Sequence, residues 1–131
     1  MQATYFSFKE DYYDLVEWWT GWKWKDYPSP STLPTTGILI KNNGKKICNC
    51  FIYKTDSDWA IISWVLINPK AAKEERKGCL EFMIKIATEE CKKLGFKLID
   101  VMIDEKVNFI KKLEEQGYFK TEILTRIIKK I

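Results

Sequence analysis

The stretch from Trp59 to Leu94 constrains the fold more than any other part of this sequence. Residues 59–67 are almost all apolar, which is typical of a buried strand, and Asn68-Pro69 ends that run. Residues 71–94 then place apolar side chains at helical spacing, and Gly95 follows as a typical C-terminal cap. The stripe of this helix consists of Cys79, Met83, Ile86, Ala87, Cys91 and Leu94. A strand that enters a helix through a short polar turn presents free backbone amides to an anion such as a pyrophosphate. This stretch therefore predicts an anion site.

The sequence before this stretch predicts a strand, a helix and a long loop. Residues 4–8 alternate as in a short strand, and a helix with Glu10 or Asp11 in its first turn then extends to Trp19. The segment from residue 20 to residue 36 is rich in proline and hydroxyl side chains, which indicates an extended loop. Such a loop is long enough to be functional.

The remaining segments predict a mixed sheet. Residues 37–41 and 46–54 flank an Asn-Asn-Gly turn and form a hairpin, which continues into the strand that begins at Trp59 as an antiparallel meander. Residues 97–103 fit a buried strand, and the helical connection before it has the length of a parallel crossover. A short helix over residues 106–116 and a final strand over residues 121–128 complete the chain.

Composition supports one compact domain over residues 1–131, and the order of the predicted elements makes it an α/β domain with a central mixed sheet flanked by helices. Of the 131 residues, 46% are apolar, which is enough for a real core. No apolar run approaches the roughly 18 to 20 residues that a membrane helix needs, and the N-terminal residues lack the pattern of a signal peptide. We therefore expect a cytoplasmic location, in the host cytoplasm if the protein is viral.

The sequence contains no histidine, and its cysteines are Cys48, Cys50, Cys79 and Cys91. A Ser-His-Asp triad, a Cys-His dyad and a His-ligated zinc site are therefore excluded. The cysteines read as reduced thiols, and their spacing does not predict a metal site. Any chemistry must rely on carboxylates, tyrosines, a thiol, water or positioning.

The order of the predicted elements resembles the GNAT superfamily of N-acetyltransferases over nearly the whole chain. The segment WVLINPKAAKEERKGCLEF is similar to the strand, turn and helix that bind acetyl-CoA in that family, and NFIKKLEEQGYF resembles its later helix with a Gly-aromatic end. The segments EWWTGWKW and LPTTG are similar to small acetyltransferase-like proteins of bacteriophages. The resemblance implies a GNAT-like fold with acetyl-CoA as the cosubstrate.

The resemblance also implies roles for particular positions. The main chain of the strand end would bind the pantetheine arm, and the turn and helix start would hold the pyrophosphate through backbone amides, assisted by Arg76 or Lys77. An asparagine of the later helix would contact the cofactor. The implied cofactor-binding residues are Val65, Leu66, Ile67, Lys73, Arg76, Lys77, Gly78, Cys79 and Asn108.

Two features depart from the family pattern. The usual pyrophosphate signature, Q/R-x-x-G-x-G/A, aligns with Glu75, Gly78 and Leu80, so only the glycine in the middle fits. Many members carry a tyrosine four residues before the Gly-aromatic pair, as the acid that protonates the departing thiolate, and this chain has Leu113 there. If the chain is an enzyme, another group or solvent must donate that proton.

Amine acetylation needs a base, a donor to the developing oxyanion and a route for the thiolate proton. A backbone amide of residues 59–67 can serve as the donor. The weak catalytic candidates are Tyr53 and Ser63, which could position water, and Asp104, which is a base candidate together with Asp56, Asp58 and Glu105 at strand ends.

The aromatic loop residues Trp22, Trp24 and Tyr27 have several interpretations. They could line an acceptor pocket, dock a protein partner or stack on single-stranded bases. The net charge of +4 is spread along the chain, so it does not demand a nucleic-acid partner. By contrast, Trp18 and Trp19 are most simply core residues.

The prediction is an N-acetyltransferase that moves an acetyl group from acetyl-CoA to a primary amine, which could be a small amine, a peptide N-terminus or a protein lysine. The alternative is a catalytically inactive GNAT-shaped protein that engages a host or viral protein through its Trp-rich loop. A monomer or a homodimer is compatible with either interpretation.

Overall fold

The computed structural model describes residues 1–104 and 109–131, which contain one five-stranded sheet in the order β1-β2-β3-β4-β5. The strands are β1 (Gln2–Tyr5), β2 (Gly37–Asn42), β3 (Lys45–Tyr53), β4 (Trp59–Ile67) and β5 (Leu98–Val101). The helices are α1 (Phe8–Gly21), α2 (Lys73–Arg76), α3 (Cys79–Lys93) and α4 (Ile110–Glu115), and a 3-10 turn, η1, covers Pro30–Thr32.

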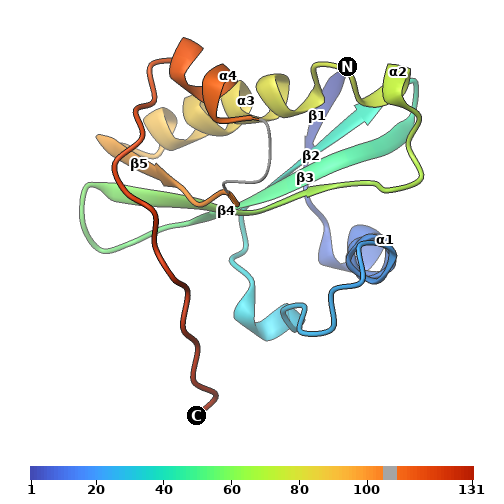
Figure 1. Ribbon diagram of the computed structural model, residues 1–131, viewed down its shortest axis with the longest axis horizontal. Helices are drawn as coiled ribbons and strands as arrows, with labels where there is room; N and C mark the ends of the chain where they lie inside the picture. Colours follow the sequence, from blue (N-terminus) through green and yellow to red (C-terminus); the bar gives the residue numbers. More distant parts are fainter. Residues whose placement is uncertain (105–108) are drawn as a thin grey trace.

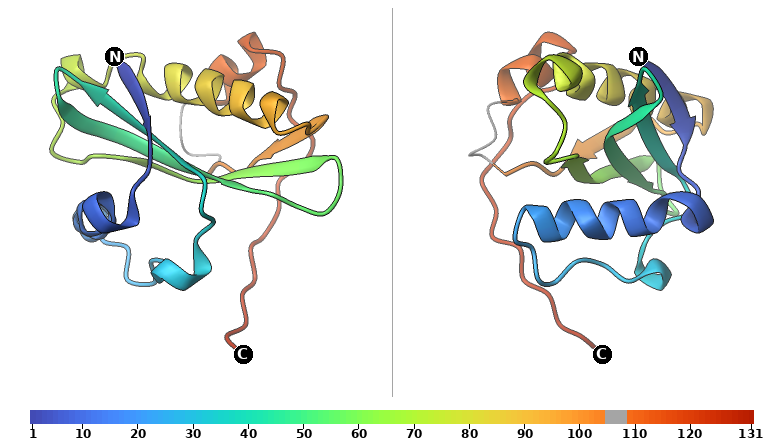
Figure 2. Two further views of the ribbon diagram at one scale, coloured as in Figure 1. Left: turned by 180° about the vertical axis from the view of Figure 1, so that it is seen from behind. Right: turned by 90° about the vertical axis from the view of Figure 1, so that its right-hand side faces the viewer.

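The elements form three layers. Helix α1 covers one face of the sheet, and α3 and α4 cover the other (Figures 1 and 2). Strands β1 to β4 are paired antiparallel, whereas β5 is parallel to β4. The segment that contains α2 and α3 makes the crossover between β4 and β5. The mixed sheet and the parallel crossover that the sequence predicts are therefore confirmed.

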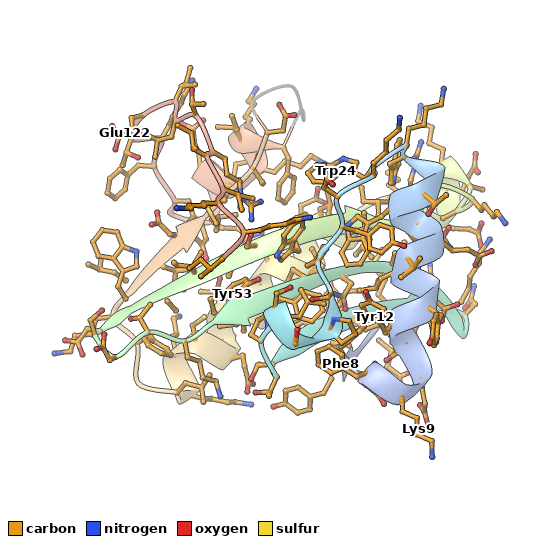
Figure 3. The ribbon with its side chains drawn as sticks, turned by 90° about the horizontal axis from the view of Figure 1, so that it is seen from below. Phe8, Lys9, Tyr12, Trp24, Tyr53 and Glu122 are labelled. Carbon is orange, nitrogen blue, oxygen red and sulfur yellow. The ribbon has the colours of Figure 1, made fainter. Side chains whose placement is uncertain are left out.

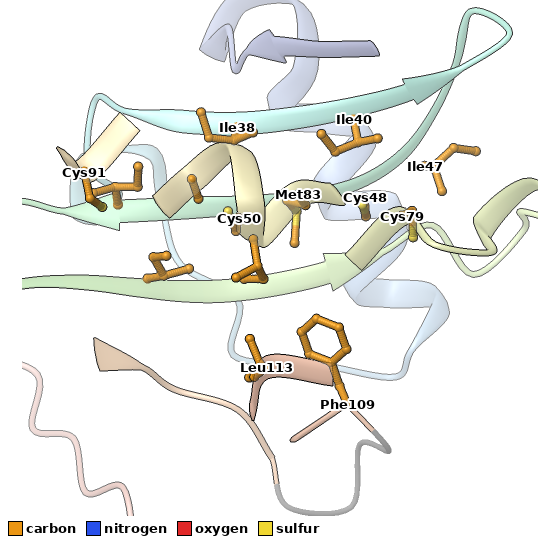
Figure 4. Packing of buried hydrophobic residues seen from close by; sticks show 14 of the residues in the cluster. Ile38, Ile40, Ile47, Cys48, Cys50, Cys79, Met83, Cys91, Phe109 and Leu113 are labelled. Carbon is orange, nitrogen blue, oxygen red and sulfur yellow. The ribbon is translucent and has the colours of Figure 1, made fainter. Parts of the chain in front are cut away.

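Alternating side chains of the sheet build two cores on its opposite faces. On the α3 face, β3 contributes Cys48, Cys50 and Ile52, which pack with Met83 and Ala87 of α3 (Figure 4). On the α1 face, Phe51 and Leu66 belong to a second core. Its other buried members are Phe6, Leu15, Trp18, Trp19, Leu33 and Leu39. This alternation explains why β3, the central strand, is buried over almost its whole length.

An ion-pair cluster fastens α1 to β3. Asp11 is 4% exposed, and its carboxylate accepts hydrogen bonds from the Ser7 amide at 2.8 Å and from Lys46 Nζ at 2.7 Å. Lys46 Nζ also lies 2.7 Å from Asp14 Oδ2. The helix begins at Phe8, slightly earlier than predicted, because Asp11 caps its first turn through the Ser7 amide.

The long predicted helix over residues 71–94 is divided in the structure. Helix α2 ends at Arg76, and α3 begins at Cys79 after Gly78, whose φ of 76° lies in the left-handed region. Because glycine adopts this conformation without a side-chain clash, the chain can turn there. Cys79, Met83, Ala87 and Cys91 are buried as predicted, whereas Leu94 is 40% exposed.

The predicted final strand over residues 121–128 is wrong. The structure has no strand or helix after α4, and every residue from Phe119 to Ile131 is exposed. The apolar residues of this segment come in adjacent pairs, Ile123-Leu124 and Ile127-Ile128, so a strand would place one member of each pair on the opposite face. Helix α4 matches the second half of the predicted helix over residues 106–116, and residues 106–108 lie outside the described part of the chain.

The buried thiols predict a loss of stability at alkaline pH. Burial raises the pKa of Cys50 from its ordinary value of 9.0 to about 12, and that of Cys91 to about 11. A group whose pKa is raised on folding stabilises the native state fully below its unfolded pKa, and this contribution is lost as pH rises through the folded pKa. We therefore expect urea denaturation to show a free energy of unfolding that falls between pH 9 and about 12. The free energy of unfolding should fall less steeply with pH in Cys50→Ala than in the unsubstituted chain. An equal dependence on pH would contradict a raised pKa of Cys50.

Candidate active site

The candidate site begins at a bulge in β4. Asn49 of β3 lies opposite Leu66, but Phe51 lies opposite Ser63, so β4 carries one extra residue between these pairs. Trp64 lies within this interval and has a φ of 54°, which is unusual for a residue with a large side chain. Bulges bend a strand and interrupt its pairing, and they are frequent next to active sites.

Strand β4 loses its second neighbour at the same place. Strand β5 pairs with β4 only from Trp59 to Ile62, and the last bond is donated by the Met102 amide to the Ile62 carbonyl at 3.2 Å. Within residues 1–104 and 109–131, no strand pairs with the outer edge of β4 from Ser63 to Ile67. An open strand edge of this kind can pair with an extended ligand through main-chain hydrogen bonds.

The three predicted pantetheine contacts lie on this edge segment. Val65 and Ile67 pack against the α3 core, whereas Leu66 belongs to the α1 core and lies opposite Asn49. The carbonyl of Ile67 accepts a hydrogen bond of 2.7 Å from Trp22 Nε1. This carbonyl therefore already has a partner within the chain.

Residues 68–78, which include α2, connect the end of β4 to the N-terminus of α3. The first hydrogen bond at this end joins the Phe82 amide to the Gly78 carbonyl at 3.1 Å, so the amides of residues 79–81 precede the intrahelical ladder. The side chain of Cys79 is buried in the core, so this residue can offer an anion only its backbone. The N-terminal amides of a 15-residue helix suit a phosphate group.

The charged residues of α2 divide into two groups. Glu75 is held in place, because its Oε1 atom accepts bonds from the Ala72 amide at 2.8 Å and from Lys45 Nζ at 3.1 Å. The Ala72 amide first, and then Lys45, lower the pKa of this carboxyl. In the described residues, no ion pair involves the predicted cations Lys73, Arg76 and Lys77. An ion pair with another described residue therefore does not hold any of these three side chains.

Glu81 places a negative charge in the first turn of α3. A Cβ atom at Gly78 would lie 3.5 Å from Glu81 Oε2. The other oxygen of this carboxylate pairs with Lys112 Nζ of α4 at 2.9 Å, which reduces its effect on a bound anion. Asn108, the remaining predicted cofactor contact, lies outside the described residues.

The catalytic candidates lie in different parts of the molecule. Ser63 is 3% exposed and belongs to β4 at the bulge, whereas Tyr53, at the end of β3, accepts a 2.8 Å bond from Trp64 Nε1. Asp104 follows β5 and lies close to the undescribed residues in sequence. Asp56 and Asp58 lie in the turn before β4, at the opposite end of this strand from the bulge.

The structure has no acid at position 113, where the resemblance implies a tyrosine. Leu113 is a buried core residue, 6% exposed, and packs on the α3 face. The nearby Tyr118 hydroxyl lies 2.6 Å from Thr88 Oγ1, and burial raises its pKa. Tyr118 is therefore directed toward α3 and not toward the edge of β4.

The aromatic loop packs around the bulge. Trp24 contacts the Trp64 ring edge-on with centroids 6.0 Å apart, and Tyr27 stacks on Trp19 at 5.7 Å. Figure 3 shows Trp24 and Tyr53 on the face of the sheet that α1 covers. The sequence pattern does not single out Trp64 as the centre of this cluster, because neither the bulge nor its backbone conformation has a local sequence signal.

Neither of the two described surface hollows is lined by residues 63–67 of β4. The larger one, of about 580 Å³, is bordered by α1 and the turn after β4, and its lining includes Asp14, Lys46 and Lys70. The other, of about 440 Å³, lies along α3 and includes Glu81 and Lys85. Several of these charges are paired within the chain, so we do not assign the candidate site to either hollow.

The mixed five-stranded sheet with helices on both faces is the fold of solved acetyltransferase structures. No protein-family model matches the sequence, and no curated protein matches it either. In the described residues, no helix is both long and apolar enough to cross a membrane.

Solved acetyltransferase structures share this fold at low sequence identity. The chain is similar to the ribosomal-protein-alanine N-acetyltransferase of Brucella melitensis biovar Abortus 2308, with a TM-score of 0.71, 8% identity and coverage of 98% of this chain and 99% of that one. The chain is also similar to an aminoglycoside acetyltransferase from an uncultured soil metagenomic sample, in complex with sisomicin. The TM-score is 0.69 and the identity 11%, with coverage of 99% of this chain and 95% of that one. For the glucosamine-6-phosphate N-acetyltransferase of Arabidopsis thaliana, the TM-score is 0.66 and the identity 10%, with coverage of 97% of each chain.

Proposed function

We propose that this chain is an N-acetyltransferase that uses acetyl-CoA to acetylate a primary amine. The observation that carries the proposal is the open edge of β4 after Ile62, which is followed along the chain by residues 68–78 and then by the N-terminus of α3. An extended pantetheine arm fits a strand edge, and a pyrophosphate fits a helix N-terminus. The two features follow one another in the order in which these parts are joined in CoA.

The chain offers contacts to two parts of this cosubstrate, the pantetheine arm and the pyrophosphate. The main chain of Val65 would bind the pantetheine arm, together with those parts of Leu66 and Ile67 that remain accessible. The amides from Gly78 onward would hold the pyrophosphate, and Lys73, Arg76 and Lys77 would add positive charge. Asn108 is retained as a proposed contact from the sequence.

Bound acetyl-CoA would supply the acetyl group as a thioester, and the overall reaction exchanges this thioester and an amine for an amide and a free thiol. The chain's contribution is mainly positioning, together with a backbone donor on β4 for the carbonyl oxygen. Ser63, at the bulge, and Tyr53 would position a water molecule, and Asp104 would serve as a base. Solvent would protonate the thiolate, because Leu113 has no proton to donate.

The test is release of free CoA thiol from acetyl-CoA in the presence of a panel of small primary amines, peptides with free N-termini and a lysine-rich protein. We expect amine-dependent release with at least one class of acceptor and a mass increase of one acetyl group on that acceptor. Absence of release across the panel, from a folded protein that binds acetyl-CoA, would refute the enzymatic proposal.

A second candidate is a binding protein with this fold that lacks transfer activity. The bond from Trp22 Nε1 to the Ile67 carbonyl favours it, because this bond occupies part of the proposed pantetheine edge. In that case Trp22, Trp24 and Tyr27 would engage a host or viral protein. The cytoplasmic location, a single domain over residues 1–131, a monomeric or homodimeric state and a bacteriophage origin belong to the proposal in either form.

A further inference from the structure

A cation lies on an aromatic ring beside the candidate site. Arg126, in the exposed C-terminal segment, places its Cζ atom 4.7 Å from the centroid of the Trp64 ring. This distance is within the range of a cation–π interaction. Trp64 occupies the bulge of β4 next to Val65, so this cation lies beside the strand edge that we propose for the pantetheine arm.

The Trp64 ring is fixed by contacts that do not involve the C-terminal segment. Its Nε1 atom donates to the Tyr53 hydroxyl at 2.8 Å, and that hydroxyl lies 3.3 Å from the Thr32 carbonyl. Trp19 and Trp24 both meet the ring edge-on, each with a centroid distance of 6.0 Å. A preorganised ring binds a cation without a further ordering cost.

The segment that carries Arg126 is held only weakly. It passes from α4 on one face of the sheet to the α1 side, as Figures 1 and 2 show. Ile123 is 65% exposed and Ile127 is 89% exposed, so the segment buries little apolar surface. In the described residues, no ion pair involves Arg126. Displacing its guanidinium from the ring would therefore cost little.

We propose that the Trp64 ring is a binding site for the positively charged end of the acceptor, and that Arg126 occupies this site when no acceptor is bound. The acceptor class is a small organic cation with an alkylguanidinium or alkylammonium group at one end and the reactive primary amine at the other. This inference rests on the proposed function for the identity of the ligand. The alkylguanidinium of Arg126 is itself an example of the chemistry that the ring accepts.

Binding of butylguanidine tests the site without acetyl-CoA. Tryptophan fluorescence and calorimetry would measure its affinity for the full chain, for Arg126→Ala and for the control Lys129→Ala, which removes a nearby exposed cation. We expect Arg126→Ala to bind butylguanidine about two- to fivefold more tightly than the unsubstituted chain, because the internal competitor is gone. Lys129→Ala should match the unsubstituted chain.

Two further comparisons separate a cation site from generic apolar binding. Butylurea has a similar shape but no charge, so we expect it to bind at least about fivefold more weakly than butylguanidine. Trp64→Phe in the Arg126→Ala background keeps an aromatic face and should weaken binding without loss of the circular dichroism signal of the fold. Equal affinities of the Arg126→Ala and unsubstituted chains, or equal binding of butylurea and butylguanidine, would overturn the proposal.

The same protein distinguishes failure of this inference from failure of the proposed function. Agmatine carries both a guanidinium and a primary amine, and it would be tested for acetylation only after butylguanidine binding and acetyl-CoA binding are measured separately. Butylguanidine binding without acetyl-CoA binding would support the cation site and remove the proposed function. Acetyl-CoA binding with no preference for butylguanidine over butylurea would remove the cation site and leave the proposed function in place.

Discussion

Gly78→Asp is expected to weaken acetyl-CoA binding about ten- to hundredfold relative to Gly78→Asn. The substitution places a carboxylate at the N-terminus of α3, where the proposal puts the pyrophosphate. Glu81 Oε2 would lie 3.5 Å from the new Cβ atom, so the two carboxylates would together repel an anion. The expected loss is therefore electrostatic.

Gly78→Asn is the matched control for backbone strain. Gly78 has a φ of 76°, so any side chain there costs folding free energy, although Asn and Asp tolerate this region better than other residues. Both variants add a side chain of nearly the same size, and they differ in charge. Calorimetry with acetyl-CoA, at matched fractions of folded protein, measures the difference in affinity. Equal affinity of the two variants would remove the N-terminus of α3 from the site.

Phe51→Ala should lower the free energy of unfolding by about 3–5 kcal/mol. Phe51 is completely buried at the centre of the α1 core, where its ring meets Phe6 at 4.9 Å and Phe8 at 6.4 Å. Gly37 approaches the same ring so closely that an added Cβ atom would lie 2.9 Å from Phe51 Cε1. Truncation would leave a cavity that these tightly packed neighbours cannot fill without moving.

Phe119→Ala is the matched control for Phe51→Ala. It removes the same side-chain atoms, but from a residue that is 81% exposed. We expect it to change the free energy of unfolding by less than about 0.5 kcal/mol. Urea denaturation of both variants gives the comparison. A similar loss in both, or a loss near zero in Phe51→Ala, would show that the α1 core is not packed as described. Phe51 also lies opposite Ser63 at the bulge, so a loosened core is expected to disturb the site.

The parts of the fold that were predicted well have strong local signals. The strand from Trp59 to Ile67 has the predicted bounds because an apolar run is ended by Asn68-Pro69. The hairpin of β2 and β3 follows from the Asn-Asn-Gly turn, where Asn43 and Gly44 both have positive φ. The predicted stripe of the long helix largely matches its buried face.

The parts that were not predicted depend on contacts between distant segments. The division of the helix before Cys79 is accompanied by the anchoring of Glu75 to Lys45 on the β2–β3 hairpin. The bulge at Trp64 appears only when β4 is paired with β3, and the contact of Arg126 with Trp64 joins positions far apart in the sequence. The final segment has apolar residues, but their adjacent pairing does not specify one buried face.

Calorimetric titration with acetyl-CoA tests the central claim, which is that the open edge of β4 and the N-terminus of α3 together bind this molecule. Desulfo-CoA and ATP are the comparisons, because desulfo-CoA retains most of the pantetheine arm and ATP lacks it. We predict saturable micromolar binding of acetyl-CoA and desulfo-CoA and much weaker binding of ATP. Absence of acetyl-CoA binding at millimolar concentration, or equally tight binding of ATP, would contradict the account.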